Sequence, residues 1–227
     1  MGRAPRVDVG NEVYHVINRA NGRQTIFHEQ AQYLHFEKVL TEAQKLTRMR
    51  ILAYALMPNH WHFVLHPRQD GDLSVFMQWL TLTHTQQYHA KMKTIGYGHL
   101  YQGRYKSFLV EQDAYLLQLI RYVERNPLRA KLVKKAQDWR WGSAYRRIKG
   151  TTQEKTLLSD TIVELPADYL LWLNERENTD TLTRIRQSVN KGTPFGVERW
   201  VERTVEKFDL RLTMRSRGRP KRGNDEL

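Results

Sequence analysis

The residues best suited to chemistry in this sequence are two histidines, His60 and His62, separated by one position. Side chains two positions apart on a strand share a face, so both imidazoles project together and Trp61 points the opposite way. Neutral imidazole is a common ligand of divalent metal ions. The alternative is a turn-capping histidine beside an ordinary sheet histidine. The apolar run 51–57 and the turn at Pro58-Asn59 set the pair at the edge of a core, which favours a metal site.

Few other ligand types are available. The sequence has no cysteine, which excludes disulfides, thiolate nucleophiles and zinc sites of the cysteine type, so histidine and oxygen ligands remain. His66 shares the face of the pair but stands at the far end of the strand. The remaining histidines have no paired spacing and are treated as background: His15, His28, His35, His84, His89 and His99.

A second candidate group is a tyrosine and an amide, Tyr122 and Asn126, at the end of a helix predicted over 113–125. Tyr122 lies off the apolar stripe that should pack this helix on the sheet, and Asn126 follows on the same flank four residues later. The stripe consists of Leu116, Leu119, Ile120 and Val123. Pro127 disfavours helical dihedrals at Asn126, which leaves two roles open for the amide, a metal ligand or a helix cap.

A phenol can serve as the nucleophile toward a DNA phosphate. The attack forms a covalent phosphotyrosine and leaves a 3′ hydroxyl that can later reverse the reaction without ATP. Because the pKa of free tyrosine is near ~10, the phenol is a weak nucleophile at neutral pH, and a metal that polarises the phosphate would offset this. The chain has eleven tyrosines, and an ordinary surface role is the alternative for any one of them.

Hydrophobic periodicity predicts the elements that must position these groups. They are a strand at 12–20, a helix at 29–48, a hairpin of strands at 51–57 and 60–66, a helix at 73–92, a strand at 105–111 and the helix at 113–125. In the last strand, Phe108 and Val110 share one face. The order fits poorly with parallel winding and predicts an α+β fold, an antiparallel sheet with helices packed on one face.

The composition turns polar at 151–156, which predicts a domain boundary. We expect a first domain at 1–150, a helical extension at 151–212 and a basic tail at 213–227. Helical patterns in the extension cover 167–177, 181–189 and 197–208. The tail surrounds Gly218-Arg219-Pro220 with Arg217 and Lys221 and resembles an AT-hook, which would lie in the minor groove of A·T-rich duplex. A basic tail without sequence preference is the alternative.

The charge points to a polyanionic partner. With 37 lysines and arginines against 24 acidic residues, the formal net charge is +13. Basic candidates for phosphate contacts gather around the tyrosine, with one aromatic residue that can stack an unpaired base: Arg104, Tyr105, Lys106, Arg121 and Arg125. A solvated charged face is the alternative. The longest apolar run, 51–57, is too short to cross a bilayer, so no membrane partner and a cytoplasmic location are expected.

Two motifs resemble the single-tyrosine His-hydrophobe-His (HUH) transposases, and most closely the REP-associated tyrosine transposases. The first is Met57-Pro58-Asn59-His60-Trp61-His62, and the second is Arg121-Tyr122-Val123-Glu124-Arg125-Asn126-Pro127. Further matches occur at 102–106 and 139–143, so the resemblance covers about residues 10 to 150.

The resemblance implies a ferredoxin-like or RNA-recognition-like sheet that carries His60 and His62 as metal ligands. It also implies Tyr122 as nucleophile and Asn126 as third ligand, where insertion-sequence relatives usually have glutamine. The expected cofactor is Mg²⁺ or Mn²⁺. The expected partner is single-stranded or hairpin DNA from repetitive extragenic palindromes (REP). The protein itself is expected to be associated with the nucleoid. The insertion-sequence relatives act as dimers, and the REP-associated branch implies a monomer.

The predicted function is therefore a metal-dependent single-strand DNA endonuclease and strand transferase that works through a 5′-phosphotyrosine. One alternative is a non-catalytic, domesticated DNA-binding protein that organises repeat sequences. A more remote alternative is a metal-dependent hydrolase that uses water in place of tyrosine. Strand cleavage and the covalent adduct separate the three.

Overall fold

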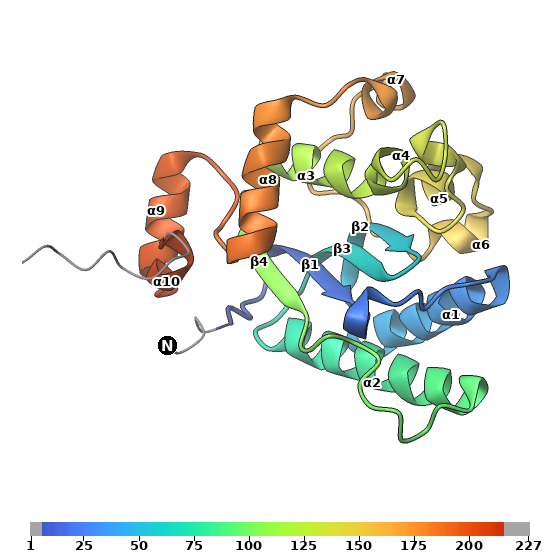
Figure 1. Cartoon of the computed structure of the whole chain (residues 1–227). Helices are drawn as coiled ribbons and strands as arrows, with labels where there is room; N and C mark the ends of the chain where they lie inside the picture. Colours follow the sequence, from blue (N-terminus) through green and yellow to red (C-terminus); the bar gives the residue numbers. More distant parts are fainter. Residues whose placement is uncertain (1–5, 216–227) are drawn as a thin grey trace, which may run out of the picture.

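A four-stranded antiparallel sheet forms the centre of the computed structural model, which describes residues 6–215. Its strands are β1 (Val13–Arg19), β2 (Arg50–Met57), β3 (His60–His66) and β4 (Lys106–Val110), in the order β2-β3-β1-β4. Helix α1 (Gln30–Thr47) joins β1 to β2, and α2 (Asp72–Met92) joins β3 to β4 (Figure 1). This βαββαβ order with its antiparallel sheet is ferredoxin-like, and the predicted α+β class is confirmed.

The pairing of β1 with β3 sets the side chains of the two strands in rows. Ile17 lies opposite His62, and Arg19 lies opposite His60. Paired residues of antiparallel strands point to the same face, so these four side chains share one face of the sheet. On the other side of β1, His15 lies opposite Phe108 of β4 and points to the same face. We call the side chains His15, Arg19, His60 and His62 on this face the histidine row.

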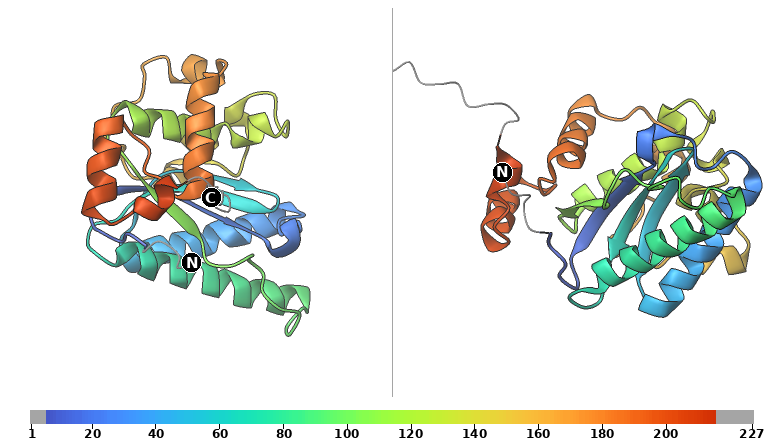
Figure 2. Two further views of the ribbon diagram at one scale, coloured as in Figure 1. Left: turned by 60° about the vertical axis from the view of Figure 1, so that its left-hand side comes forward. Right: turned by 60° about the horizontal axis from the view of Figure 1, so that its bottom comes forward.

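Helices cover both faces of the sheet. Helices α1 and α2 pack side by side on one face, over Trp61 and Phe63 (Figure 2), whereas the sequence predicted all the helices on a single face. Helix α3 (Ala114–Glu124) covers the opposite face. The strands alternate large apolar residues toward α1 and α2 with smaller ones such as Ala55 and Val64 toward α3, so both faces have apolar surface to bury.

The apolar stripe predicted for α3 is confirmed by its packing. Its members Leu116, Leu119, Ile120 and Val123 are fully buried against β2 and β3. The helix begins at the cap Asp113, whose side chain accepts a hydrogen bond from the Tyr115 amide at 2.8 Å. It ends at Glu124, just ahead of Asn126 and Pro127.

Further helices follow α3 in the described part of the chain. They are α4 (Asn126–Arg129), α5 (Ser143–Lys149), α6 (Thr152–Lys155), α7 (Tyr169–Asn174), α8 (Thr179–Lys191), α9 (Glu198–Lys207) and α10 (Arg211–Met214). Phe195, between α8 and α9, is buried and forms a parallel bridge with Val110 of β4. The division of the chain at residue 150 stays a prediction. Within residues 6–215, the helices are too short or too polar to span a bilayer.

Candidate active site between the sheet and helix α3

The paired histidines lie on the face of β3 that points to α3. Their ring centroids are 5.1 Å apart with an interplanar angle of 74°. His60 Nδ1 contacts Asn59 Oδ1 at 2.6 Å, and His62 Nδ1 lies 3.0 Å from His15 Nε2. His62 Nε2 is buried and has no hydrogen-bond partner among residues 6–215. One nitrogen of each ring is thus held by the protein, while the second nitrogen of His62 stays available.

Helix α3 brings Tyr122 next to these rings. Its ring centroid lies 6.1 Å from that of His62 and 6.3 Å from that of His15, edge-on in both cases. Tyr122 is 7% exposed. The side chain sits at the border of the apolar stripe, so the packing that buries α3 also turns the phenol toward the histidine row. Residues 60 positions apart in sequence therefore meet at one site.

Burial sets the protonation of the site. It lowers the pKa of His60 to about 4, with a smaller contribution from the nearby Arg19 guanidinium. Burial also holds the pKa of His62 well below its ordinary value, and His15, His60 and arginines act in the same direction. Both rings are neutral at neutral pH, which is the form that binds a metal ion. Burial raises the pKa of Tyr122, an effect opposed first by Arg129.

Arg129 of α4 covers the nucleophile candidate. Its guanidinium lies 4.2 Å from the centroid of the Tyr122 ring and donates to both carboxylate oxygens of Glu177, at 2.9 and 2.7 Å. Arg125 pairs with the same carboxylate at 3.0 Å and donates to the Leu173 carbonyl. Arg125 is 7% exposed, so in this structure its contacts are within the protein. The cation beside the phenol favours the phenolate.

Asn126 closes the C-terminal end of α3. Its Nδ2 donates to the carbonyls of Tyr122 and Val123, both at 3.2 Å. The structure thus assigns the helix-cap role to the amide nitrogen, and the amide oxygen is the atom that remains for a ligand. Within residues 6–215, no three His, Cys, Asp or Glu side chains are grouped to hold a metal ion. A metal on the histidine pair would therefore need the amide or water for its remaining ligands.

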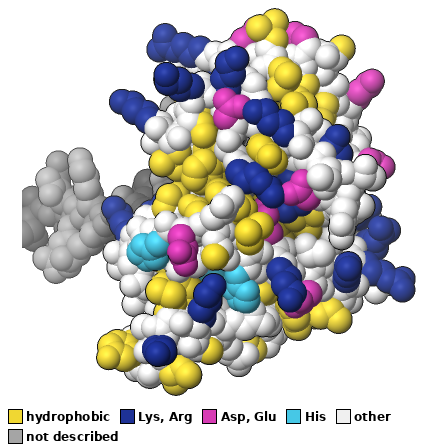
Figure 3. All heavy atoms as spheres, turned by 90° about the vertical axis from the view of Figure 1, so that its right-hand side faces the viewer, with side chains coloured by type: hydrophobic (Ala, Val, Ile, Leu, Met, Phe, Trp, Pro, Cys, Tyr) yellow, Lys and Arg dark blue, Asp and Glu magenta, His cyan; other side chains and the backbone are white. Residues whose placement is uncertain are grey.

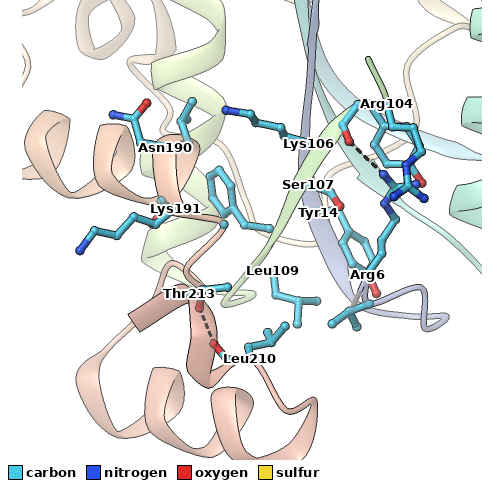
Figure 4. A pocket seen from close by; sticks show the side chains of 16 residues that line it. Arg6, Tyr14, Arg104, Lys106, Ser107, Leu109, Asn190, Lys191, Leu210 and Thr213 are labelled. Carbon is cyan, nitrogen blue, oxygen red and sulfur yellow. Dashed lines mark hydrogen bonds between the residues drawn. The ribbon is translucent and has the colours of Figure 1, made fainter. Parts of the chain in front are cut away.

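Three of the predicted DNA-contacting residues line a cleft of about 370 Å³ at the open edge of β4 (Figure 4). They are Arg104, Tyr105 and Lys106. Tyr105 is 7% exposed, and the Arg6 guanidinium lies 4.0 Å from its ring centroid, so its accessible ring face is already stacked. Arg104 and Lys106 are exposed. They also line a second cleft, of about 310 Å³, together with Ile17 and Arg19 from the histidine face.

Figure 3 presents the side of the molecule that lies to the right in Figure 1, away from α8, α10 and the clefts beside them. Figure 3 shows more lysine and arginine than acidic side chains on the face it presents. Arg121, another predicted contact, is half-buried and donates to the Glu175 carbonyl at 2.9 Å. The remaining predicted contacts, Arg217, Arg219 and Lys221 of the basic tail, lie outside the described residues.

Two residues that sequence patterns did not single out also belong to this site. His15 is fully buried beside His62, and Arg19 has a buried Nε without a hydrogen-bond partner in the described part of the chain. The pairing of β1 with β3 puts both side chains in the histidine row. Their alternate spacing on a predicted strand was the available signal, but the sequence does not contain the register that aligns β1 with β3.

The fold and the site together define a protein of the single-tyrosine transposase type, with a histidine pair on a ferredoxin-like sheet beneath a helical tyrosine. The family model described as "Transposase IS200 like" matches residues 8–126, which is more than half of the chain. The chain belongs to this family. The matched span includes His60, His62, Tyr122 and Asn126.

The solved structures that are similar to the chain include two transposases. A REP-associated tyrosine transposase bound to a REP hairpin has a TM-score of 0.56 at 16% identity, covering 79% of this chain and all (100%) of that one. This likeness in fold agrees with the resemblance seen in the sequence motifs. A candidate transposase from Deinococcus radiodurans R1 has a TM-score of 0.38 at 15% identity, covering 58% of this chain and 91% of that one. No curated protein sequence matches the chain.

Proposed function

We propose that the chain is a metal-dependent endonuclease and strand transferase for single-stranded DNA at REP-type hairpins, which acts through a 5′-phosphotyrosine at Tyr122. Membership of the IS200-like transposases supports DNA cleavage and rejoining as the class of reaction. The observation that carries the proposal is the approach of the Tyr122 ring to within 6.1 Å of His62, whose Nε2 is buried without a partner. The named structural relative binds a REP hairpin, which supports the substrate class.

The residues present fit a divalent cation. His60 and His62 are neutral, and an orphaned ring nitrogen is the donor atom that a metal ion requires. We propose Asn126 Oδ1 as the third ligand, because the amide nitrogen is engaged at the end of α3. When bound there, Mg²⁺ or Mn²⁺ supplies polarisation of the scissile phosphate.

The side chains of the chain itself carry the transfer. Arg19 holds the phosphate through its guanidinium, whose buried Nε has no partner in the described part of the chain, and Arg129 stabilises the phenolate of Tyr122. The bond from Tyr122 Oη to phosphorus forms and the bond from phosphorus to the 3′ oxygen breaks. The phenol gives up one proton and the leaving 3′ hydroxyl gains one. The reverse attack by a 3′ hydroxyl restores the tyrosine and rejoins the strand.

The clefts at the edge of β4 provide a path for the strand toward the site. Arg104 and Lys106 are exposed along it, and Arg19 connects it to the histidine row. Phosphate contacts of this kind fix the position of the strand. Because Tyr122 faces the histidines of its own chain, one chain supplies the whole site, which supports a monomer. Binding of A·T-rich duplex by the tail and a cytoplasmic, nucleoid-associated location stay predictions.

One observation favours the non-catalytic alternative. Tyr122 is 7% exposed beneath Arg129, so the phenol must be uncovered before a phosphate can reach it. A chain in which this cover never opens would bind DNA without cutting it. Arg129 is held over the ring by its ion pair with Glu177, which also pairs with Arg125.

A denaturing gel of hairpin DNA labelled at its 3′ end tests the proposal. With Mn²⁺, the wild-type protein should shift the label into a protein–DNA adduct, because the 5′-phosphotyrosine retains the 3′ part of the strand. Tyr122→Phe should bind the hairpin with unchanged affinity and form no adduct. Persistence of the adduct in this variant rules out Tyr122 as the nucleophile. Binding without cleavage by the wild type supports the non-catalytic alternative, and cleavage without adduct supports a water-using hydrolase.

A further inference from the structure

His15 lies at the centre of the sheet face beneath α3, with none of its surface exposed. Its ring stacks on that of His62 with centroids 5.1 Å apart and an interplanar angle of 28°, and its other neighbours include Phe108, at 4.9 Å. The surrounding cluster is otherwise made of apolar side chains such as Val13 and Val64. An imidazole placed there loses its hydration, and an aliphatic side chain would fill the same space at lower cost.

The imidazole makes one hydrogen bond, and that bond goes to the candidate metal ligand. His15 Nε2 lies 3.0 Å from His62 Nδ1, while His15 Nδ1 is buried without a partner in the described part of the chain. Between two neutral rings, one nitrogen donates and the other accepts. If His62 Nδ1 donates, its Nε2 has a free lone pair. If His15 donates, His62 Nε2 carries a hydrogen and cannot bind a metal ion.

The charges around His62 favour the first arrangement. Arg19 shares the sheet face with His62, two positions from its partner Ile17, and the Arg129 guanidinium lies over the neighbouring Tyr122 ring. A cation attracts a bare lone pair more than an N–H group. Histidine ligands commonly donate from their second nitrogen to a neighbouring acceptor, which fixes both the tautomer and the plane of the ring. Here the acceptor is a second imidazole on the adjacent strand, β1, aligned by the pairing of Ile17 with His62.

We propose that His15 is a positioning residue: its Nε2 accepts the Nδ1 hydrogen of His62 and so keeps His62 Nε2 bare and aimed at the metal position beside Tyr122. The proposal rests on the function proposed above, because it assigns His62 to the metal. It goes further by naming the group that makes His62 competent as a ligand. His15 itself touches neither substrate nor metal.

Two substitutions separate hydrogen bonding from packing. His15→Leu fills the space without an acceptor, whereas His15→Gln places an amide oxygen at about the reach of the imidazole Nε2. His84→Leu is the matched control, because His84 is also a buried imidazole with a hydrogen bond, but on the opposite face of the sheet, where it contacts Tyr101. Thermal unfolding of all three variants checks that each one folds.

The first measurement is the affinity of the full chain for Mn²⁺ without DNA, followed by the electron paramagnetic resonance signal of the free ion. We expect His15→Leu to weaken binding about 10- to 100-fold, as second ligand-shell changes commonly do. His15→Gln should restore most of the affinity, and His84→Leu should leave it unchanged. Equal affinities for His15→Leu and wild type overturn the role of His15 while leaving the metal site intact.

The second measurement needs no metal. Nitrogen-15 chemical shifts of His62 report which ring nitrogen carries the hydrogen. We expect the Nδ1–H form of His62 in the wild type and in His15→Gln, and a mixture of both forms in His15→Leu. An Nε2–H form in the wild type overturns the proposal. If the wild type shows the expected tautomer but binds no Mn²⁺, the metal-dependent function fails and the hydrogen-bond assignment stands.

Discussion

The two faces of the sheet treat their polar side chains differently, although the same four strands build both. Toward α1 and α2, the Trp61 indole donates to the Tyr101 hydroxyl at 3.1 Å, and His84 Nδ1 lies 2.7 Å from the same oxygen. Toward α3, His62 Nε2 and Arg19 Nε are buried with no partner in the described part of the chain. Orphaned buried polar atoms are uncommon in folded proteins. Such atoms also occur on the α1 and α2 side, at His35 Nε2 and Tyr105 Oη, but among the described side chains of the four strands they lie only on the face toward α3. That face therefore retains groups that a ligand can satisfy.

We call the face toward α1 and α2 the closed face and the face toward α3 the open face. The largest effect that should follow from this comparison is on stability at the closed face. Trp61 is fully buried, and its ring centroid lies 4.7 Å from that of Phe63. Trp61→Ala should lower the free energy of unfolding by about 3–5 kcal/mol, because it removes a large buried ring and leaves a cavity. Urea denaturation at pH 7 measures the change.

His62→Ala is the matched change, one position along the same strand and on the opposite face. It removes a smaller ring that has one hydrogen bond to the protein. We expect a smaller loss of stability than for Trp61→Ala, together with loss of the covalent adduct. Equal destabilisation by the two variants contradicts the division between the faces.

The next effect concerns chemistry at the open face. Arg19→Gln removes the guanidinium whose Nε lacks a partner beside the histidine row. Adduct formation should slow by about 10²–10³-fold, the range found when one charge-stabilising donor is removed from an active site. Single-turnover kinetics on hairpin DNA measures the rate.

Arg23→Gln is the control, since Arg23 is exposed and lies beyond the end of β1. It should leave the rate of adduct formation near that of the wild type. A similar slowing in both variants indicates that general positive charge, and not the position of Arg19, drives the effect.

Sequence patterns predicted the elements of the sheet and the residues on them that meet, but not the contacts that distinguish the two faces. Period two in β3 and the stripe on α3 place His62 and Tyr122 without knowledge of tertiary structure. No sequence pattern singles out His15, because its partner is decided by strand register. The sequence predicts a DNA contact for Arg125. In the structure Arg125 pairs with Glu177, which lies far along the chain and carries no local sequence signal.

A pH-dependent effect follows from the buried histidine of the closed face. Burial lowers the pKa of His84 to about 3, from about 6.5 in an unfolded chain. Between these values the unfolded chain binds a proton that the folded chain excludes, so stability falls as the pH drops through this window. One such group contributes about 1.4 kcal/mol per pH unit. His84→Leu should lose less stability than the wild type between about pH 6 and pH 4 in urea denaturation, and a parallel decline contradicts the assignment.

The smallest effect sharpens the boundary of the open face. Arg104 is exposed at both clefts, so Arg104→Gln should weaken hairpin binding and reduce the slope of log affinity against log salt by about 0.7–0.9, the contribution of one phosphate contact. Arg125→Gln is the control, because Arg125 is buried against Glu177. It should destabilise the protein and leave the salt slope unchanged. Both arginines are predicted DNA contacts by sequence, so only their environments in the fold can separate the two results. A reduced salt slope for Arg125→Gln would mean that its ion pair with Glu177 opens when DNA binds.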